Sequence, residues 1–194
     1  MPRNRYIPGE TLRIVALSGS VSPGNLTRRA LEVTLGGAAA DGAETELIDL
    51  SLVPLPFCDE RREERAYPPE VEALRRAVGS AHGIVLGSPE YHGSMSGALK
   101  NALDLMGSAE FEGKIVGLVG VAGGSQGAPG SLAHMRTVCR SMHAWVLPHQ
   151  ASIAFARKAF DAEGRPLDGE LEERLVTIGR EVARYARLHA GLNP

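Results

Sequence analysis

The run LRIVALSGSVSPGN, residues 12–25, decides the fold class of this chain. Its first six residues, LRIVAL, form a short apolar segment with β-branched side chains. Such a segment is typical of a strand buried on both faces. Small polar residues follow, and then Leu26, Ala30 and Val33 keep helical spacing in a stretch that ends at Gly42. A buried strand that runs directly into a helix is the beginning of a parallel α/β unit.

Four more apolar runs repeat this alternation. They are ETELIDL (44–50), HGIVLGSPEY (82–91), KIVGLVGV (114–121) and AWVL (144–147). The accompanying helical patterns begin at Pro69, include Leu99, Leu103 and Met106, cover residues 131–142, and run from Leu171 to Tyr185. Because consecutive parallel strands need helical crossovers, the sequence predicts a doubly wound α/β fold, a five-stranded parallel sheet with helices on both faces.

Length and composition indicate an ordinary globular protein. The chain has 194 residues, of which 43% are hydrophobic and 23% charged. A single core accommodates a chain of this size, so we expect one domain over residues 1–194, with residues 1–11 as a loose N-terminal arm.

Charge and cysteine content indicate which kinds of partner and which cellular compartment to expect. Lys and Arg number 21 against 23 Asp and Glu, so no strong field attracts nucleic acid or a membrane, and neither is expected as a partner. The first residues lack the apolar stretch of a secretory signal, and Cys58 and Cys139 do not form a disulfide framework. These features favour a cytoplasmic protein that acts on small molecules.

Three loops of unusual composition each follow a predicted strand. They are SGSVSPGN (18–25), GSPEYHGSMSG (87–97) and AGGSQGAPG (122–130), called the first, second and third loops below. Doubly wound folds bind ligands beyond the carboxyl ends of their strands. We therefore expect the three loops to form one site.

The first loop has the composition of a phosphate site. Its hydroxyl and amide side chains lie directly before a helix: Ser18, Ser20, Ser22, Asn25 and Thr27. A helix N-terminus adds free backbone N–H groups and the positive end of the helix dipole. The spacing of Gly19 and Gly24 resembles a P-loop, but Asn25 replaces the lysine of that motif, which favours a single phosphate. A simple turn with a Ser or Asn helix cap fits the first loop equally well.

The second loop gives the chain its most specific family likeness. The stretch GSPEYHGSMSGALKNALD (87–104) resembles the signature of the NADPH-dependent FMN reductase family, which also includes quinone, azo-dye and chromate reductases. The stretch GSVSPGNLT (19–27) is similar to the phosphate loop of that family, and the likeness runs from about Leu12 to Leu147. It implies a flavodoxin-like fold with strand order 2-1-3-4-5, with FMN and NADPH or NADH as cofactors.

The resemblance also implies roles for single residues. The FMN phosphate would be held by Ser18, Ser20, Ser22, Asn25, Leu26 and Thr27. The isoalloxazine ring would be lined by Pro89, Glu90, Tyr91, His92, Gly93 and Ser94, with Gly123 and Gly124 approaching from the third loop. Many members carry an arginine shortly after the first Gly-Ser, where this chain has Val21 and Ser22.

The expected reaction passes hydride from NAD(P)H to FMN and on to a flavin, quinone, azo or metal acceptor. Stacking of the two rings supplies the geometry, so no catalytic side chain is expected. One domain would leave the outer face of the flavin open, and the resemblance implies a homodimer or homotetramer. Cys139 and His143 stand four residues apart on a predicted helix, but zinc needs three or four ligands, so no metal site is expected.

Two other functions remain open at this point. The sequence from Gly123 to Gly127 matches the G-x-S-x-G pattern of a serine hydrolase, with Ser125 as nucleophile. Asp161 or Asp168 followed by His189 would supply the chain order of a triad, although no HGGG-type oxyanion segment is present. A flavodoxin-type electron carrier is the other alternative, but such carriers tend to be strongly acidic, whereas this chain has a net charge of −2.

Overall fold

The computed structural model describes residues 11–59 and 67–191. The strands are β1 (Arg13–Ser18), β2 (Glu44–Asp49), β3 (Gly83–Pro89), β4 (Ile115–Val121) and β5 (Trp145–Ile153). The helices are α1 (Leu26–Ala40), α2 (Pro69–Ser80), α3 (Gly97–Asp104), α4 (Ser108–Phe111), α5 (Pro129–Ser141), α6 (Ala156–Ala159) and α7 (Gly169–Ala190). Of the predicted N-terminal arm the structure describes Thr11, and of the charged stretch DERREER (59–65) it describes Asp59; the other residues of both lie outside the described ranges.

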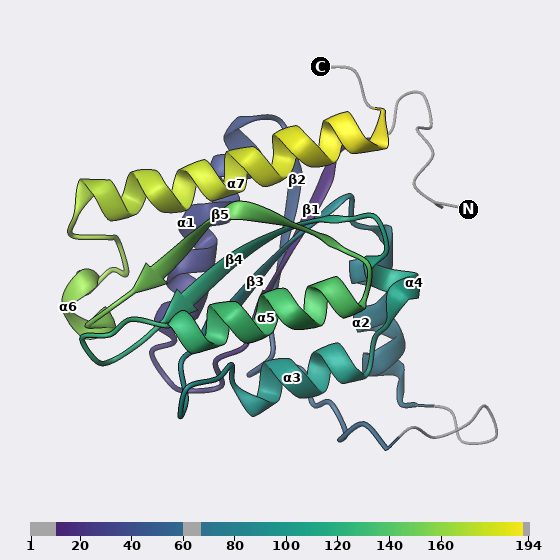
Figure 1. The fold of residues 1–194 in the computed structure, drawn as a ribbon, viewed down its shortest axis with the longest axis horizontal. Coiled ribbons are helices and arrows are strands. Elements are labelled where there is room, and N and C mark those ends of the chain that lie inside the picture. Colours follow the sequence, from purple (N-terminus) through teal and green to yellow (C-terminus); the bar gives the residue numbers. More distant parts are fainter. Residues whose placement is uncertain (1–10, 60–66, 192–194) are drawn as a thin grey trace.

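The five strands form one parallel sheet in the order β2-β1-β3-β4-β5 (Figure 1). This order is that of flavodoxin-like sheets, so the predicted fold and the strand order are confirmed. Strands β3 and β4 are buried along their whole length, as expected for central strands covered on both faces. None of the helices within the described ranges is both long and apolar enough to cross a lipid bilayer.

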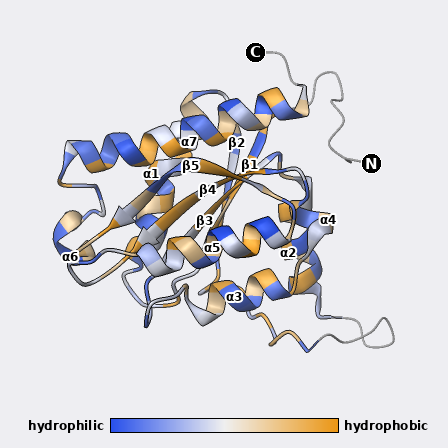
Figure 2. Cartoon of the chain, viewed as in Figure 1, coloured by the Kyte–Doolittle hydropathy of each residue, from blue (hydrophilic) through white to orange (hydrophobic). Residues whose placement is uncertain are grey.

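Helices cover both faces of the sheet. Helices α1 and α7 lie on one face, where Leu31 and Leu175 pack with Ile14 of β1 in one buried cluster. Helices α2, α3 and α5 lie on the other face, where Leu99 and Met135 belong to a second cluster. Figure 2 shows the central strands β3 and β4 coloured mainly as hydrophobic, whereas α5 and α7 alternate between the two colours. Each helix therefore contributes one apolar stripe to a core and leaves the rest of its surface to solvent.

Helices α1 and α7 approach each other closely enough for their backbones to touch. A methyl group on Gly37 would collide with the carbonyl of Val176, and one on Gly179 would collide with the carbonyl of Thr34. Only glycine permits this approach, because any side chain at either position would push the helices apart.

Strand β5 is longer than predicted. The sequence analysis ended it at Leu147, because a proline and polar residues follow, but the strand continues to Ile153. The pairing of β4 with β5 shifts register between Val116 and Leu118. This irregularity accommodates Pro148, which has no N–H to donate to a regular ladder.

Three smaller features of the helices also differ from the prediction. The short helices α4 and α6 were not predicted, and α5 begins at Pro129 rather than at residue 131. Tyr185 was assigned to the apolar face of the last helix, but it is 40% exposed, whereas Ala186 is buried. The inner face of α7 therefore continues in alanines toward its C-terminus.

Candidate functional site

The structure brings the three loops together at the carboxyl edge of the sheet. They follow β1, β3 and β4, which are neighbours in the sheet. The backbone N–H of Gly19 donates to the carbonyl of Gly87 at 2.8 Å, and Ser96 Oγ donates to the carbonyl of Gly19 at 2.6 Å. The backbone N–H of Glu90 donates to the carbonyl of Val121 at 2.8 Å. The second loop is therefore bonded to the first loop on one side and to the end of β4 on the other.

The side chain of Asn25 organises the first loop. Its Nδ2 donates to Ser18 Oγ at 3.1 Å and to the carbonyl of Ser20 at 2.8 Å. Its Oδ1 accepts from the backbone N–H of Arg28 at 2.9 Å, which caps α1. Ser18 is fully buried, so these two predicted binding residues hold the loop in shape.

Other donors of the first loop surround the N-terminus of α1. Ser20 is 5% exposed and Thr27 is 2% exposed. No hydrogen bond between described residues involves the Thr27 hydroxyl, and Ser22 Oγ lies 3.4 Å from Tyr91 Oη of the second loop. Leu26 packs against the core beneath the loop. These hydroxyls and the free N–H groups of the first helical turn are the donor set that a single phosphate requires.

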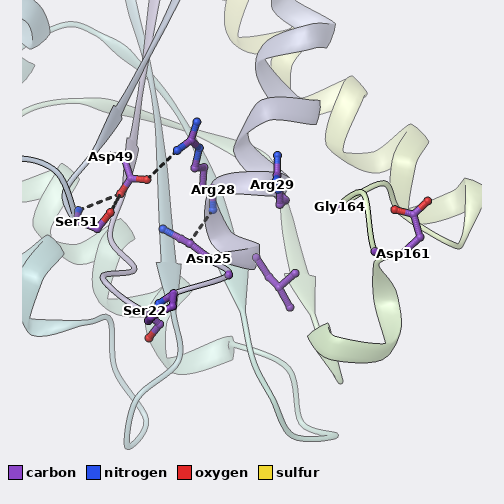
Figure 3. Close-up of a pocket in the computed structure, with 12 residues that line it drawn as sticks. Ser22, Asn25, Arg28, Arg29, Asp49, Ser51, Asp161 and Gly164 are labelled. Atoms are coloured by element: carbon purple, nitrogen blue, oxygen red, sulfur yellow. Dashed lines mark hydrogen bonds and ion pairs between the residues drawn. The ribbon is translucent and has the colours of Figure 1, made fainter.

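A hollow of about 400 Å³ lies on the outer side of the first loop (Figure 3). Its arginines are already paired, since Arg28 contacts Glu32 at 2.9 Å and Asp49 at 3.4 Å, and Arg29 contacts Glu32 at 3.0 Å. The hydrogen bond and the charge of Glu32, with a smaller contribution from Asp49, raise the pKa of Arg28. These pairings leave little net positive charge in the part of the hollow beside Arg28 and Arg29.

The second loop makes a tight turn through His92 and Gly93. Tyr91 and Ser94 exchange two backbone hydrogen bonds of 2.9 and 3.0 Å, and the φ angles of His92 and Gly93 are 52° and 79°. Two successive positive φ values are the mark of a type I′ turn, which Asn-Gly usually occupies. The turn holds Tyr91 and His92 at the surface.

Helix α5 supports the second loop through residues that the sequence analysis missed. Glu90 Oε2 accepts from the backbone N–H of Ser131, and Ser131 Oγ lies within hydrogen-bonding distance of the carbonyl oxygens of Pro89 and Ser94. The Oγ of Ser94 lies 2.9 Å from Nδ1 of His134. The carboxylate of Glu90, predicted to line a ring, is therefore directed to the N-terminus of α5.

The third loop presents open backbone. Gly123 and Gly124 are exposed, and a Cβ atom on either would meet nothing within 4 Å. The carbonyl of Gly124 accepts from the backbone N–H of Phe155 at 3.0 Å, which ties the loop to the segment after β5. A flat ligand could approach this backbone without a side chain in the way.

The triad of the hydrolase alternative is not assembled. Ser125 is exposed in the third loop at the carboxyl edge. The ring of His189 lies 6.3 Å from that of Trp145, the first residue of β5, and is therefore at the opposite edge of the sheet. Asp168 caps α7, and Asp161 pairs with Arg165 at 2.8 Å.

Comparison with known proteins settles the family. The family model described as NADPH-dependent FMN reductase matches residues 12–158. The chain belongs to the NADPH-dependent FMN reductase family. An NAD(P)H-dependent FMN reductase of Pseudomonas aeruginosa is 32% identical over 169 residues, covering 84% of this chain and 89% of the relative. An NADPH:quinone oxidoreductase of Arabidopsis thaliana is 35% identical over 177 residues, covering 86% and 88%.

A solved structure extends the likeness of this FMN reductase family member to the fold. The NAD(P)H:acceptor oxidoreductase FerB of Paracoccus denitrificans superposes with a TM-score of 0.76 at 20% identity, covering 92% of this chain and 99% of that protein. The family description and the name of the Pseudomonas relative combine NAD(P)H with FMN, and this chain is an NAD(P)H-dependent flavin oxidoreductase.

The described residues fit FMN. The first loop offers neutral donors and a helix N-terminus, and the carboxylate of Asp49 nearby is bonded to Ser51 and Arg28. The backbone of Gly123 and Gly124 is unobstructed for a planar ring. Both parts lie at one edge of the sheet, where doubly wound folds bind ligands.

Proposed function

We propose that this FMN reductase family member passes hydride from NAD(P)H to FMN and on to a flavin, quinone, azo or metal acceptor. The observation that carries the proposal is that two types of loop, one rich in hydroxyl groups and one with accessible backbone, lie side by side at one edge of the sheet. A hydroxyl-rich loop precedes α1, and two loops with accessible backbone lie beside it. The name of the quinone-reducing relative supports an acceptor of the quinone class.

In this proposal the first loop binds the phosphate of FMN. Ser20, Ser22 and Thr27 donate hydroxyl hydrogen bonds, Leu26 contributes its backbone N–H, and Asn25 keeps the loop in the shape that aims them. Charge-assisted hydrogen bonds of this kind are about twice as strong as neutral ones.

The second and third loops orient the ring. Residues Pro89 to Ser94 run along its polar edge, and Gly123 with Gly124 approach it from the other side. FMN supplies the hydride chemistry when it is bound. The share of the protein is to position the two planar reactants and to offer N–H donors where negative charge develops, so no side chain acts as acid or base in the hydride step.

We further propose that residues 1–194 form one domain and that the protein is cytoplasmic and a homodimer or homotetramer. Cys58 and Cys139 are free thiols, which suits a reducing compartment. A second copy would cover the face of the ring that one copy leaves open. Equilibrium sedimentation tests the assembly: a monomer that retains FMN and full activity would contradict it.

Mixing the FMN-loaded protein with NADPH in the absence of oxygen tests the reaction. We expect the flavin absorption band to bleach within seconds, and then to return when a quinone is added. An electron carrier of the flavodoxin type would bind FMN but would not be bleached by NADPH alone. Ser125→Ala serves as the control for the hydrolase alternative and should leave bleaching unchanged. Absence of fluorescence quenching on titration with FMN would overturn the proposal.

A further inference from the structure

A second hollow lies beside the third loop. It has a volume of about 380 Å³ and is lined by the end of β5, by α6 and by the first turns of α7. In Figure 1, α6 and the start of α7 lie together at the end of the molecule toward which the β4 and β5 arrows point. The backbone N–H groups of Phe155 and Ala156 donate to the carbonyls of Gly124 and Ala122 at 3.0 and 2.9 Å. The wall of this hollow is therefore continuous with the third loop.

The hollow contains two cations that form no ion pair within the described residues. Lys158 and Arg174 line it, and no ion pair joins either to another residue of the described ranges. Asp168 also lines the hollow, but its carboxylate accepts from the backbone N–H of Glu170 at 3.0 Å as the cap of α7. Two cations against one carboxylate leave the lining of this hollow with a net positive charge.

An exposed aromatic ring stands beside these cations. Phe155 is 49% exposed, and Lys158 Nζ lies 5.7 Å from the centre of its ring. The residue is held at φ 45° and ψ 45°, a left-handed conformation that is strained for a bulky side chain. An exposed ring kept in a strained conformation points to a binding role, and a ring with a neighbouring cation suits a flat, anionic ligand.

We infer that this hollow binds the adenosine 2′-phosphate end of NADPH, with Phe155 stacking on the adenine and Lys158 and Arg174 contacting the 2′-phosphate. The inference rests on the proposed function, which places the nicotinamide over the ring of FMN at the second and third loops. The rest of the dinucleotide must then extend past one of the loops. NADPH differs from NADH only by that phosphate, so the two cations make this hollow selective for NADPH.

The other hollows near the site are less suitable. The one beyond the first loop has its arginines paired with Glu32 and Asp49. Another, between the first loop and the start of α3, is lined by uncharged residues such as Val21, Phe57 and Ala98. Of these three hollows, the one with Lys158 and Arg174 combines an exposed aromatic ring with cations that form no ion pair within the described residues.

Steady-state kinetics with both dinucleotides tests the assignment on the FMN-loaded protein. In Lys158→Ala and Arg174→Ala, the ratio of kcat/KM for NADPH to that for NADH should fall about tenfold, because each variant removes one charge-assisted contact with the 2′-phosphate. Arg140→Ala is the matched control, since Arg140 is an exposed arginine at the end of α5, near the amino edge of the sheet. Adenosine 2′,5′-bisphosphate should compete with NADPH more strongly than 5′-AMP does, and less so in both variants.

Phe155→Asn tests the stacking contact separately. Asparagine tolerates the left-handed conformation, so the turn is kept while the ring is lost, and KM should rise several-fold for NADPH and NADH alike. The assignment would be overturned if kcat/KM fell equally for NADPH and NADH in the lysine and arginine variants. Unchanged KM values in all three variants would also overturn it. Failure of the unmodified protein to bind FMN or to be bleached by NADPH would instead refute the proposed function, and the inference with it.

Discussion

The carboxylate of Glu90 in the second loop accepts a 2.7 Å hydrogen bond from the backbone N–H of Ser131, in the first turn of α5. A negative charge at a helix N-terminus is favourable, because it satisfies a free N–H group and interacts with the helix dipole. Ser131 returns the contact through its hydroxyl, which lies 2.8 Å from the carbonyl of Ser94 and 3.1 Å from that of Pro89. The backbone proposed to lie along the flavin is thus fixed to α5.

Glu90→Ala should therefore loosen the second loop. We expect the free energy of unfolding to fall by roughly 1–2 kcal/mol, as for other lost helix caps, and FMN affinity to fall with it. Glu90→Gln retains an acceptor oxygen and should lose less of both. Urea unfolding and FMN fluorescence titration provide the two measurements, and a Glu90→Ala protein with unchanged values in both would contradict this role.

The double variant Ser20→Ala/Thr27→Ala should weaken FMN binding by several kcal/mol at most. Each charge-assisted hydrogen bond to a phosphate contributes roughly 1.5–3 kcal/mol. Ser20 lies in the first loop and Thr27 in the first turn of α1. Thr137→Ala, at an exposed position on α5, is a suitable control. If titration gave the same dissociation constant for both variants, the first loop would not be the phosphate site.

His92→Gly should stabilise the protein against unfolding. His92 has a positive φ of 52°, which is unfavourable for a residue with a Cβ atom and is relieved in glycine. The gain should be about 1 kcal/mol or less, because glycine also gives the unfolded chain more freedom. His92→Val, with a β-branched side chain in the same turn, should destabilise. Thermal unfolding of the two variants measures these effects. A His92→Val protein more stable than His92→Gly would contradict the positive φ angle at this position.

Lys114 should make stability depend on pH. Its ammonium is buried and donates to the carbonyls of Val78 and Gly79 at the end of α2. Burial lowers the pKa of Lys114 from 10.5 to about 8, with a smaller opposing effect from Glu110. Between those two pH values the unfolded chain binds the proton that the folded chain has released, so the free energy of unfolding should rise with pH.

Lys114→Met provides the reference for this effect. The stability difference between the parent and the variant should shift in favour of the parent, by roughly 3 kcal/mol at most, as pH increases from 8 to 10.5. Urea unfolding at intervals of one pH unit measures it. If the free energy of unfolding changed with pH in the same way for both proteins, Lys114 would not titrate in this pH range.

The sequence predicted the fold because the strands β1, β3 and β4 are short apolar runs that each end in a glycine-containing polar turn. It also placed the three loops at one edge, since parallel topology alone brings the carboxyl ends of strands together. The end of β5 was missed because Pro148 resembles a strand terminator, whereas the register shift of the ladder accommodates it.

Contacts made by neighbouring elements could not be read from the sequence. Ser131 and His134 lie about 40 residues from Glu90 and Ser94 along the chain, and their hydrogen bonds exist only because α5 packs beside the second loop. The left-handed conformation of His92 was also missed. A His-Gly pair gives a weaker turn signal than Asn-Gly, which is the usual sequence of such turns.

The glycine contact between α1 and α7 lets the last helix fix the orientation of α1, and through α1 the position of the proposed phosphate loop. Helix α1 begins at the loop proposed to bind the phosphate. Gly37 and Gly179 allow its C-terminal half to pack closely against α7. A side chain at either glycine should tilt α1 and displace its N-terminus from the proposed phosphate site. A substitution in α7, a helix outside the three loops, would then be detected first as a loss of the yellow colour of bound FMN.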